Sequence, residues 1–451
     1  MDQHFNGGSP MNRTVEKDKT LLVEGPASVI VISGKTEIFG HAVRPSSQVV
    51  KVVIREGKRL PFAVEEATTF DLALAEKATV EEVVGNTVPQ SWVKVVEELL
   101  GVQGKPAVAM VLGTTDSGKT SLCTYLVNRL LIQKKKVAVL DGDLGQSDIG
   151  PPCTVAYTYV TKPLTDLFNL RARDARFIGT TSPSSVTEKV KEAMFSLKKE
   201  ALESNLDYVL VNSDGWIEGD DAVNYKQQLI ETINPDILIG IQKNDELTNL
   251  LSTLGKYQKV IVESPQIINQ RSREKRKNLR ELGYQKYLRN SKLLSFPLGW
   301  LKIENGDLLG LTRTRQSIKE ARRIYDLLGM KPLHIAEQSD RITIIIGKKR
   351  WINAENLKKA EEATKKKVIV VRKGEEEGLL TGLYNSDGKF LGIGVIQEID
   401  YLRKTLKFLT SVSETIATAA IGKVKLDKNL KEVSSFDEEN QSEFTTFNKL
   451  F

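Results

Sequence analysis

The feature that most constrains this 451-residue sequence is a glycine-rich segment between an apolar strand pattern and a helix pattern. Residues 107–112 are all apolar, as in a strand buried on both faces of a parallel sheet. Residues 119–133 follow a helical period. Between them, the phosphate-loop pattern G-x-x-x-x-G-K-[ST] is matched by Gly113-Thr114-Thr115-Asp116-Ser117-Gly118-Lys119-Thr120. The context predicts a strand–loop–helix unit that binds a nucleoside triphosphate.

The chemistry of this loop assigns a role to each part. Backbone N–H groups and the helix N-terminus would hold phosphates, Lys119 would bridge the β- and γ-phosphates, and the Thr120 hydroxyl would ligate Mg²⁺. We therefore expect ATP and Mg²⁺ as cofactors. GTP remains an alternative donor because residues 242–245, Gln-Lys-Asn-Asp, differ by one residue from a guanine-reading motif, although a polar loop after a strand explains them equally well. The nucleotide-binding residues are predicted to be Gly113, Thr114, Thr115, Asp116, Ser117, Gly118, Lys119, Thr120 and Ser121.

Two carboxylates follow the next apolar strand pattern, residues 137–140. Asp141 and Asp143 are two residues apart, so they would point to the same side if the strand continues. One would hold metal-bound water and the other would accept a proton from a nucleophile. A simple turn-capping role is the alternative for each, and it is stronger for Asp141, which we nevertheless predict as a metal ligand.

Alternating strand and helix patterns predict an α/β fold: a central P-loop NTPase domain with a parallel sheet, between a small N-terminal β domain and a β-rich C-terminal domain. No apolar run approaches the 18 residues of a membrane helix, and the chain has only two cysteines and three histidines. These counts favour a cytoplasmic protein without a disulfide scaffold. The predicted segments are 1–18 disordered, 19–66 N-terminal β, 67–104 connecting and helical, 105–304 P-loop with a lid around 265–292, 305–435 C-terminal β, and 436–451 flexible.

The charge of the lid segment is concentrated. Nine basic residues and only two acidic ones lie between Arg271 and Lys292, a local excess equal to the +7 net charge of the whole chain. Such a patch is typical of a surface that meets phosphates. A solvated helix face is the alternative.

Several segments together resemble the polynucleotide 5′-hydroxyl kinases, a family with archaeal polyribonucleotide kinases and eukaryotic relatives in tRNA splicing, mRNA 3′-end formation and ribosomal RNA maturation. The resemblance covers about residues 20–300. It rests on the phosphate loop with residues 141–146, and on segments resembling the family's clasp (177–183), its strand end with Gly-Trp (211–216), its lid (271–276) and its N-terminal β domain (35–40).

The resemblance implies transfer of the γ-phosphate of ATP, or of GTP, to the 5′-hydroxyl end of RNA, with single- or double-stranded DNA as a further acceptor. Asp143 would be the general base, and Arg271 and Arg276 the catalytic lid arginines beside Lys119; Arg273 and Arg280 compete for that role. The substrate-binding residues would be Gln146, the clasp residues Thr180, Thr181 and Ser182, and Trp216. The clasp departs from the family by lacking a histidine. Alternatively, Trp216 would be an ordinary aromatic residue of the core, and the clasp residues would only precede the N-terminus of the next helix.

Two other functions compete with the kinase. One is an RNA-processing scaffold that binds ATP without transferring phosphate. This chain retains Lys119, Asp143 and Gln146, which argues against a loss of phosphate transfer. The other is a P-loop ATPase of the partition or metal-insertase type, which usually carries a second lysine within the loop, where this chain has residues 114–117.

Overall fold

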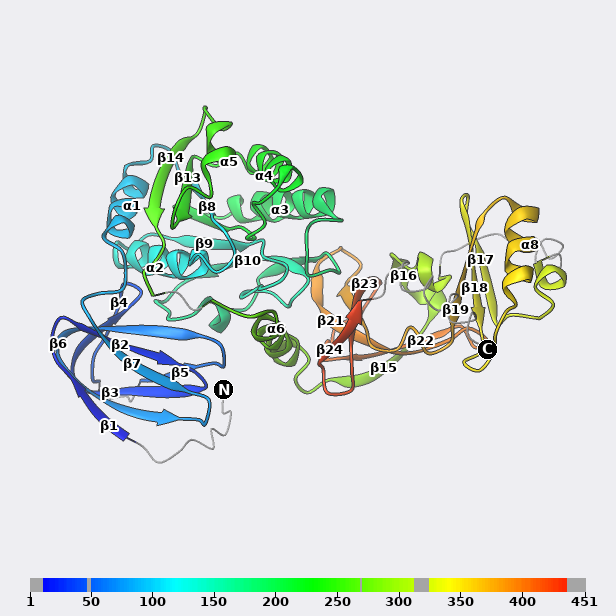
Figure 1. Ribbon diagram of the computed structural model, residues 1–451, viewed down its shortest axis with the longest axis horizontal. Helices are drawn as coiled ribbons and strands as arrows, with labels where there is room; N and C mark the ends of the chain where they lie inside the picture. The colour runs from blue at the N-terminus through cyan, green and yellow to red at the C-terminus, as the bar shows by residue number, and fades with distance from the viewer. Residues whose placement is uncertain (1–10, 47–49, 268–269, 312–323, 436–451) are drawn as a thin grey trace. The chain divides into compact units, whose positions relative to one another are not determined.

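The computed structural model describes residues 11–46, 50–267, 270–311 and 324–435. Two compact units make up the chain (Figure 1). The first comprises Met1–Arg176 and Ser182–Gly283, and the second comprises Phe177–Thr181 and Tyr284–Phe451. In the part of the chain that is described, no helix has the length and apolar character needed to cross a membrane.

The first unit begins with an antiparallel sheet in the order β4-β3-β6-β2-β7, in which β1 also pairs with β6 and β5 with β3. Alternating apolar side chains on the two long strands, β3 and β6, face the core of this sheet. The strands are β1 (Met11–Val15), β2 (Lys19–Glu24), β3 (Ala27–Ile38), β4 (His41–Val43), β5 (Lys51–Ile54), β6 (Arg59–Leu74) and β7 (Thr79–Val84).

Two predictions for this region are wrong. Residues 11–15, within the segment predicted as disordered, form β1 because β6 provides a partner strand for an otherwise polar sequence; residues 1–10 lie outside the description. Residues 67–84, within the predicted helical connection, continue β6 and form β7. Phe70 and Leu72 are buried in alternation with more exposed neighbours, so strand pairing overrides the helix-forming Leu, Ala and Glu residues.

The central sheet of the first unit has the order β11-β10-β9-β12-β8-β13-β14, with parallel strands from β9 to β14 and β10 antiparallel to β9. Right-handed crossovers place α2, with α1, on one face and α3, α4 and α5 on the other (Figure 1). The strands are β8 (Ala107–Leu112), β9 (Val137–Asp141), β10 (Thr154–Val160), β11 (Asp174–Phe177), β12 (Tyr208–Asn212), β13 (Ile237–Gln242) and β14 (Gln258–Glu263).

The helices of this unit cover a sheet whose middle strands are buried along their whole length. They are α1 (Gln90–Gly101), α2 (Lys119–Ile132), α3 (Thr187–Leu202), α4 (Asp220–Ile233) and α5 (Thr248–Ser252), with the 3-10 turn η1 (Leu167–Asn169). A further helix, α6 (Arg273–Tyr287), begins in this unit, and its residues from Tyr284 on belong to the second. The carboxyl ends of β8, β9 and β12 lie side by side, because Asn212 is in register with both Asp141 and Val111. The predicted P-loop domain with its mostly parallel sheet is therefore confirmed.

The second unit contains an antiparallel sheet in the order β15-β22-β21-β20-β23-β16, with β16 parallel to β23, and a smaller sheet, β17-β18-β19. The β-rich C-terminal domain is thus confirmed, but β15 and β16 lie before its predicted start at residue 305 because they pair with β22 and β23. Residues 436–451, the predicted flexible tail, lie outside the description.

The elements of the second unit are β15 (Lys292–Pro297), η2 (Leu298–Trp300), β16 (Lys302–Glu304), η3 (Asp307–Leu309), β17 (His334–Glu337), β18 (Arg341–Ile346), α8 (Ala354–Thr364), β19 (Lys367–Arg372), β20 (Leu379–Tyr384), β21 (Phe390–Asp400), β22 (Thr405–Thr410), β23 (Thr418–Leu426) and β24 (Glu432–Ser435).

Candidate active site

The phosphate loop connects β8 to α2 in the geometry that its sequence predicts. Gly118, with φ of 105°, turns the chain into the helix that begins at Lys119. A Cβ atom at Gly113 would lie 2.6 Å from the Ser117 Oγ atom, so only glycine fits there. The Lys119 ammonium is buried and donates to the carbonyls of Gly113 at 3.0 Å and Thr114 at 2.7 Å. Burial lowers the pKa of Lys119, while the charge of Asp143 acts in the opposite direction.

Asp141 ends β9 and lies wholly buried beside the loop. Its carboxylate accepts hydrogen bonds from the Asp148 N–H at 2.8 Å and from the Asn212 amide at 3.1 Å. The same Asn212 amide lies 3.4 Å from the Thr120 hydroxyl. Burial raises the pKa of Asp141 to about 7, helped by the nearby carboxylates Asp148 and Asp143. The start of α2, the end of β9 and the end of β12 therefore lie together. They place the Thr120 hydroxyl and the Asp141 carboxylate, which the sequence predicts as metal ligands, on either side of Asn212.

Asp143 lies in the loop after β9 and lines the same cavity as Lys119. Its Oδ1 atom accepts hydrogen bonds from the backbone N–H groups of Gly145 at 3.1 Å and Gln146 at 2.9 Å. Within the described part of the chain, Oδ2 has no hydrogen-bond partner. Burial raises the pKa of Asp143, and the Lys119 charge lowers it. This is a carboxylate fixed by one oxygen, with the other available to accept a proton.

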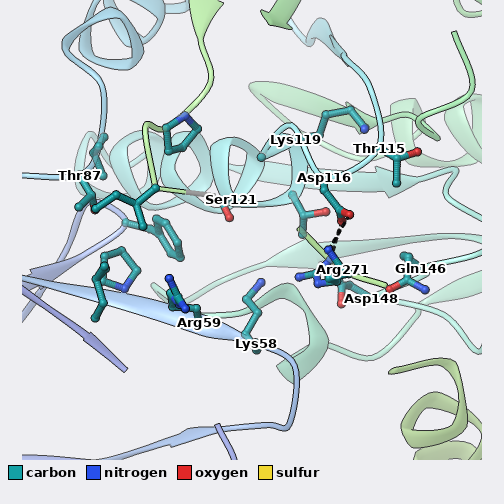
Figure 2. A pocket seen from close by; sticks show the side chains of 18 of the residues that line it. Lys58, Arg59, Thr87, Thr115, Asp116, Lys119, Ser121, Gln146, Asp148 and Arg271 are labelled. Atoms are coloured by element: carbon teal, nitrogen blue, oxygen red, sulfur yellow. Dashed lines mark hydrogen bonds and ion pairs between the residues drawn. The ribbon is translucent and has the colours of Figure 1, made fainter. Parts of the chain in front are cut away.

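The two predicted lid arginines converge on one phosphate-loop residue. Arg271 precedes α6 and its backbone N–H donates to the Asp116 carboxylate at 3.1 Å, with its guanidinium 3.5 Å from the same group. Arg276, in the first turns of α6, donates to Asp116 at 3.0 Å. Figure 2 marks the contact between Asp116 and Arg271 with a dashed line. The Gln146 amide also donates to the Arg276 carbonyl at 3.1 Å, so the lid is attached to the Asp143 loop as well.

A cavity of about 1130 Å³, solvent-open space included, joins these groups to the N-terminal sheet. The sheet contributes three cations to its wall, Arg55, Lys58 and Arg59, of which Lys58 and Arg59 are labelled in Figure 2. Arg55 donates to Asp166 at 2.9 Å and to Asp148 at 2.5 Å, and it lies 4.2 Å from the Phe168 ring centroid. Our sequence analysis missed these three residues, although three cations within five positions at a glycine turn were visible in it.

The structure brings only part of the predicted site residues to the cavity. Those that line it are Thr115, Asp116, Gly118, Lys119, Thr120, Ser121, Asp143, Gln146 and Arg271. Trp216 follows β12 and stacks on Tyr225, with ring centroids 5.6 Å apart. Thr180 and Thr181 fall in the segment Phe177–Thr181 of the second unit, and Ser182 begins the next segment of the first unit.

The segment that suggested guanine recognition is used in a local turn. The Glu246 carboxylate accepts hydrogen bonds from the backbone N–H groups of Lys243 and Asn244. The Gln242 side chain accepts from the Leu247 N–H at 3.3 Å. These contacts favour the polar-loop interpretation over base recognition.

Fold and site define a P-loop protein in which the start of α6 and the N-terminal β sheet lie beside the phosphate loop. A protein-family model described as "mRNA cleavage and polyadenylation factor CLP1 P-loop" matches residues 113–290. The solved structure of the wild-type Clp1p–Pcf11p complex contains a chain with the same fold. Its TM-score is 0.64 at 12% identity, over 93% of this chain and 99% of that one.

Two archaeal relatives match most of the sequence. The polyribonucleotide 5′-hydroxyl-kinase of Pyrococcus abyssi is 28% identical over 361 residues, which are 78% of this chain and 97% of the relative. The corresponding protein of Methanocaldococcus jannaschii is 28% identical over 345 residues, 74% of this chain and 91% of the relative. The chain is thus similar over about three quarters of its length to archaeal polynucleotide 5′-hydroxyl-kinases, and over a shorter stretch to the proteins named Grc3 and Nol9.

Proposed function

We propose that this protein is a polynucleotide kinase that transfers the γ-phosphate of ATP, with GTP as an alternative donor, to the 5′-hydroxyl of RNA. The observation that carries the proposal is the shared cavity, in which the buried Lys119, the carboxylate of Asp143 and the lid residue Arg271 face one space. RNA is favoured over DNA because the archaeal relatives are named for polyribonucleotides.

Each residue then has a task that its surroundings support. Lys119 neutralises the terminal phosphates, and Asp143 accepts the proton of the 5′-hydroxyl through its unpaired Oδ2 atom. Arg271, with Arg276 as its partner, neutralises charge on the phosphoryl group as it moves between oxygens. Gln146 holds the lid against the Asp143 loop and reaches the terminal phosphate.

The oxygen donors at the edge of the sheet fit Mg²⁺. Thr120 and Asp141 are joined through Asn212, and the buried Ser117 hydroxyl has no hydrogen-bond partner among the described residues. The described residues hold no cluster of three or more His, Cys, Asp or Glu side chains suited to a metal. A cation held by one hydroxyl and one carboxylate must share ligands with phosphates and water, as Mg²⁺ commonly does. When bound, Mg²⁺ would neutralise charge on the β- and γ-phosphates.

Acceptor binding is assigned to the clasp and to Trp216. Hydroxyl and N–H groups of Thr180, Thr181 and Ser182 would hold the first backbone phosphate of the acceptor. Trp216, already stacked on Tyr225 on one face, would offer its other face to a terminal base.

The test is phosphate transfer from γ-labelled ATP with Mg²⁺ to matched RNA and DNA oligonucleotides carrying either a 5′-hydroxyl or a 5′-phosphate. Label should appear on 5′-hydroxyl ends and not on 5′-phosphate ends, and Lys119→Ala should abolish it. Comparing the RNA and DNA lanes ranks the acceptors, and replacing ATP by GTP ranks the donors. Nucleotide binding without any labelled oligonucleotide would refute the kinase and favour an ATP-bound scaffold.

A further inference from the structure

The small sheet of the second unit has an exposed tryptophan at the end of its parallel strands. β18 and β19 are parallel, with Ile346 in register with Arg372, and α8 connects them (Figure 1). Trp351 lies just beyond the end of β18, after a turn in which the Arg350 N–H donates to the Gly347 carbonyl at 2.9 Å. In open α/β sheets, ligands bind outside the carboxyl ends of parallel strands, so this is the edge where a site is expected.

Trp351 is held in place without being buried. The Arg372 guanidinium lies 4.1 Å from its ring centroid and covers one face of the ring. Trp351 is nevertheless 66% exposed. A tryptophan that merely closed the end of a core would lose most of its exposure, so this arrangement leaves one flat aromatic face available to solvent. Arg372 keeps its guanidinium partly paired with Glu375 at 3.4 Å, while its buried Nε atom has no partner among the described residues.

Three consecutive cations precede the tryptophan. Lys348, Lys349 and Arg350 are all exposed, and in the described part of the chain their side chains form no ion pair. No acidic residue interrupts the run from Gly347 to Ile352. An aromatic face beside unpaired cations is the combination by which proteins bind single-stranded nucleic acid, because bases stack on the ring and phosphates meet the cations.

We propose that Trp351, Arg372 and the cations of residues 348–350 form a binding site for single-stranded RNA, separate from the phosphate-loop cavity. A base stacks on the open face of Trp351, and the neighbouring phosphates lie against Lys348 and Lys349. The inference rests on the proposed function only in its choice of RNA as the polynucleotide. Neither the P-loop family model, which ends at residue 290, nor the predicted acceptor residues include this site.

The experiment measures binding without requiring phosphate transfer. A 12-nucleotide, 5′-phosphorylated RNA with a 3′ fluorescein is titrated with nucleotide-free full-length protein, and anisotropy gives the Kd at several salt concentrations. The variants are Trp351→Ala, Trp351→Phe and the double change Lys348→Ala with Lys349→Ala. The matched control is Trp300→Ala, since Trp300 is 77% exposed in the same unit and has no ring or cation partner among the described residues. Circular dichroism melting checks the fold of each variant.

We expect Trp351→Ala to weaken binding by roughly 5- to 100-fold and Trp351→Phe by only a few fold, because any aromatic face supports stacking. The double lysine variant should reduce the slope of log K against log salt by about 1.4, the value for two lost phosphate contacts. Trp300→Ala should match the wild type. Equal affinity of wild type and Trp351→Ala, or an equal loss in Trp300→Ala, would overturn the site. Absence of kinase activity in a protein that shows the expected binding pattern would refute only the proposed function.

Discussion

Replacing Asp143 by Asn tests the assignment of the general base most directly. Asn has nearly the same shape, and its amide oxygen can still accept the N–H groups of Gly145 and Gln146 that hold the loop. The change places an NH₂ group where Oδ2 faces the cavity, and this group cannot accept a proton. Lys119 keeps its bonds to the loop carbonyls, so nucleotide binding should survive.

The expected loss follows from the chemistry of a single base. General-base catalysis typically contributes about 10²–10⁴-fold, or roughly 2.7–5.5 kcal/mol of transition-state stabilisation. Single-turnover transfer from γ-labelled ATP to a 5′-hydroxyl RNA should slow by that factor in Asp143→Asn. A fluorescent ATP analogue should bind with a Kd within a few fold of the wild-type value.

The pH dependence gives a second readout of the same assignment. Burial raises the pKa of Asp143 even though Lys119 opposes the shift, so the acid limb of the rate profile should lie above the ordinary carboxyl value of about 4. The wild-type rate should fall as pH falls through that raised pKa, because the protonated carboxyl is not a base. Asp143→Asn should lose this limb.

Asp148→Asn is the matched comparison, because this carboxylate lines the same cavity but is paired with Arg55. It should slow transfer much less than Asp143→Asn does. A rate for Asp143→Asn within a few fold of wild type, or an equal loss in both variants, would refute the base assignment.

Three further predictions concern the lid, the buried charge cluster and the acceptor. Arg271→Ala should lower kcat by about 10³–10⁵-fold, and Arg276→Ala should lower it less. Equally small losses of kcat in the two variants would exclude an arginine-finger role. Asp166→Asn should lower the free energy of unfolding at pH 7 by about 3–5 kcal/mol, because it leaves the charge of Arg55 partly uncompensated. Burial disfavours the Asp166 charge, but its cationic partners outweigh burial and hold its pKa below the ordinary value, so the stability difference in denaturant titrations should shrink as pH falls below about 4. Trp216→Ala should raise the KM for the RNA acceptor with little change in kcat; an unchanged KM would leave the ring a purely structural role.

The parts of the site that are close in sequence were predictable. The phosphate loop requires two glycines, a lysine and a hydroxyl at fixed spacing, and the flanking strand and helix patterns are unambiguous. The positions of Asp141 and Asp143 beside the loop were predictable for the same reason, since both follow the buried strand β9, whereas their roles stay predictions. The family resemblance added the identity of the lid.

The errors came from contacts that join distant residues. Residues 67–74, within the segment predicted as connecting and helical, contain Leu and Ala residues that favour a helix, and pairing with β3 and β1 makes them the end of β6. Arg271 and Arg276 do not lie one turn apart on a helix, and no common partner for them could be predicted from the sequence. They share Asp116 because α6 begins only at Arg273, which leaves Arg271 on the preceding chain.

The N-terminal cations show why the cavity needs both sheets of the first unit. Positive side chains gathered in one space repel each other unless carboxylates stand between them. Asp166 pairs with both Arg55 and Lys58, and Asp148 pairs with Arg55 as well. Asp116 pairs with Arg276 of the predicted lid. Each carboxylate belongs to the P-loop domain, whereas Arg55 and Lys58 come from the turn before β6. A triphosphate entering this space brings negative charge of its own, so it can take over cations that carboxylates now hold, Arg271 and Arg276 first, because they pair with the phosphate loop itself. These carboxylate–cation pairs are therefore the charges that we expect a nucleotide to engage, and neither sheet alone contains them.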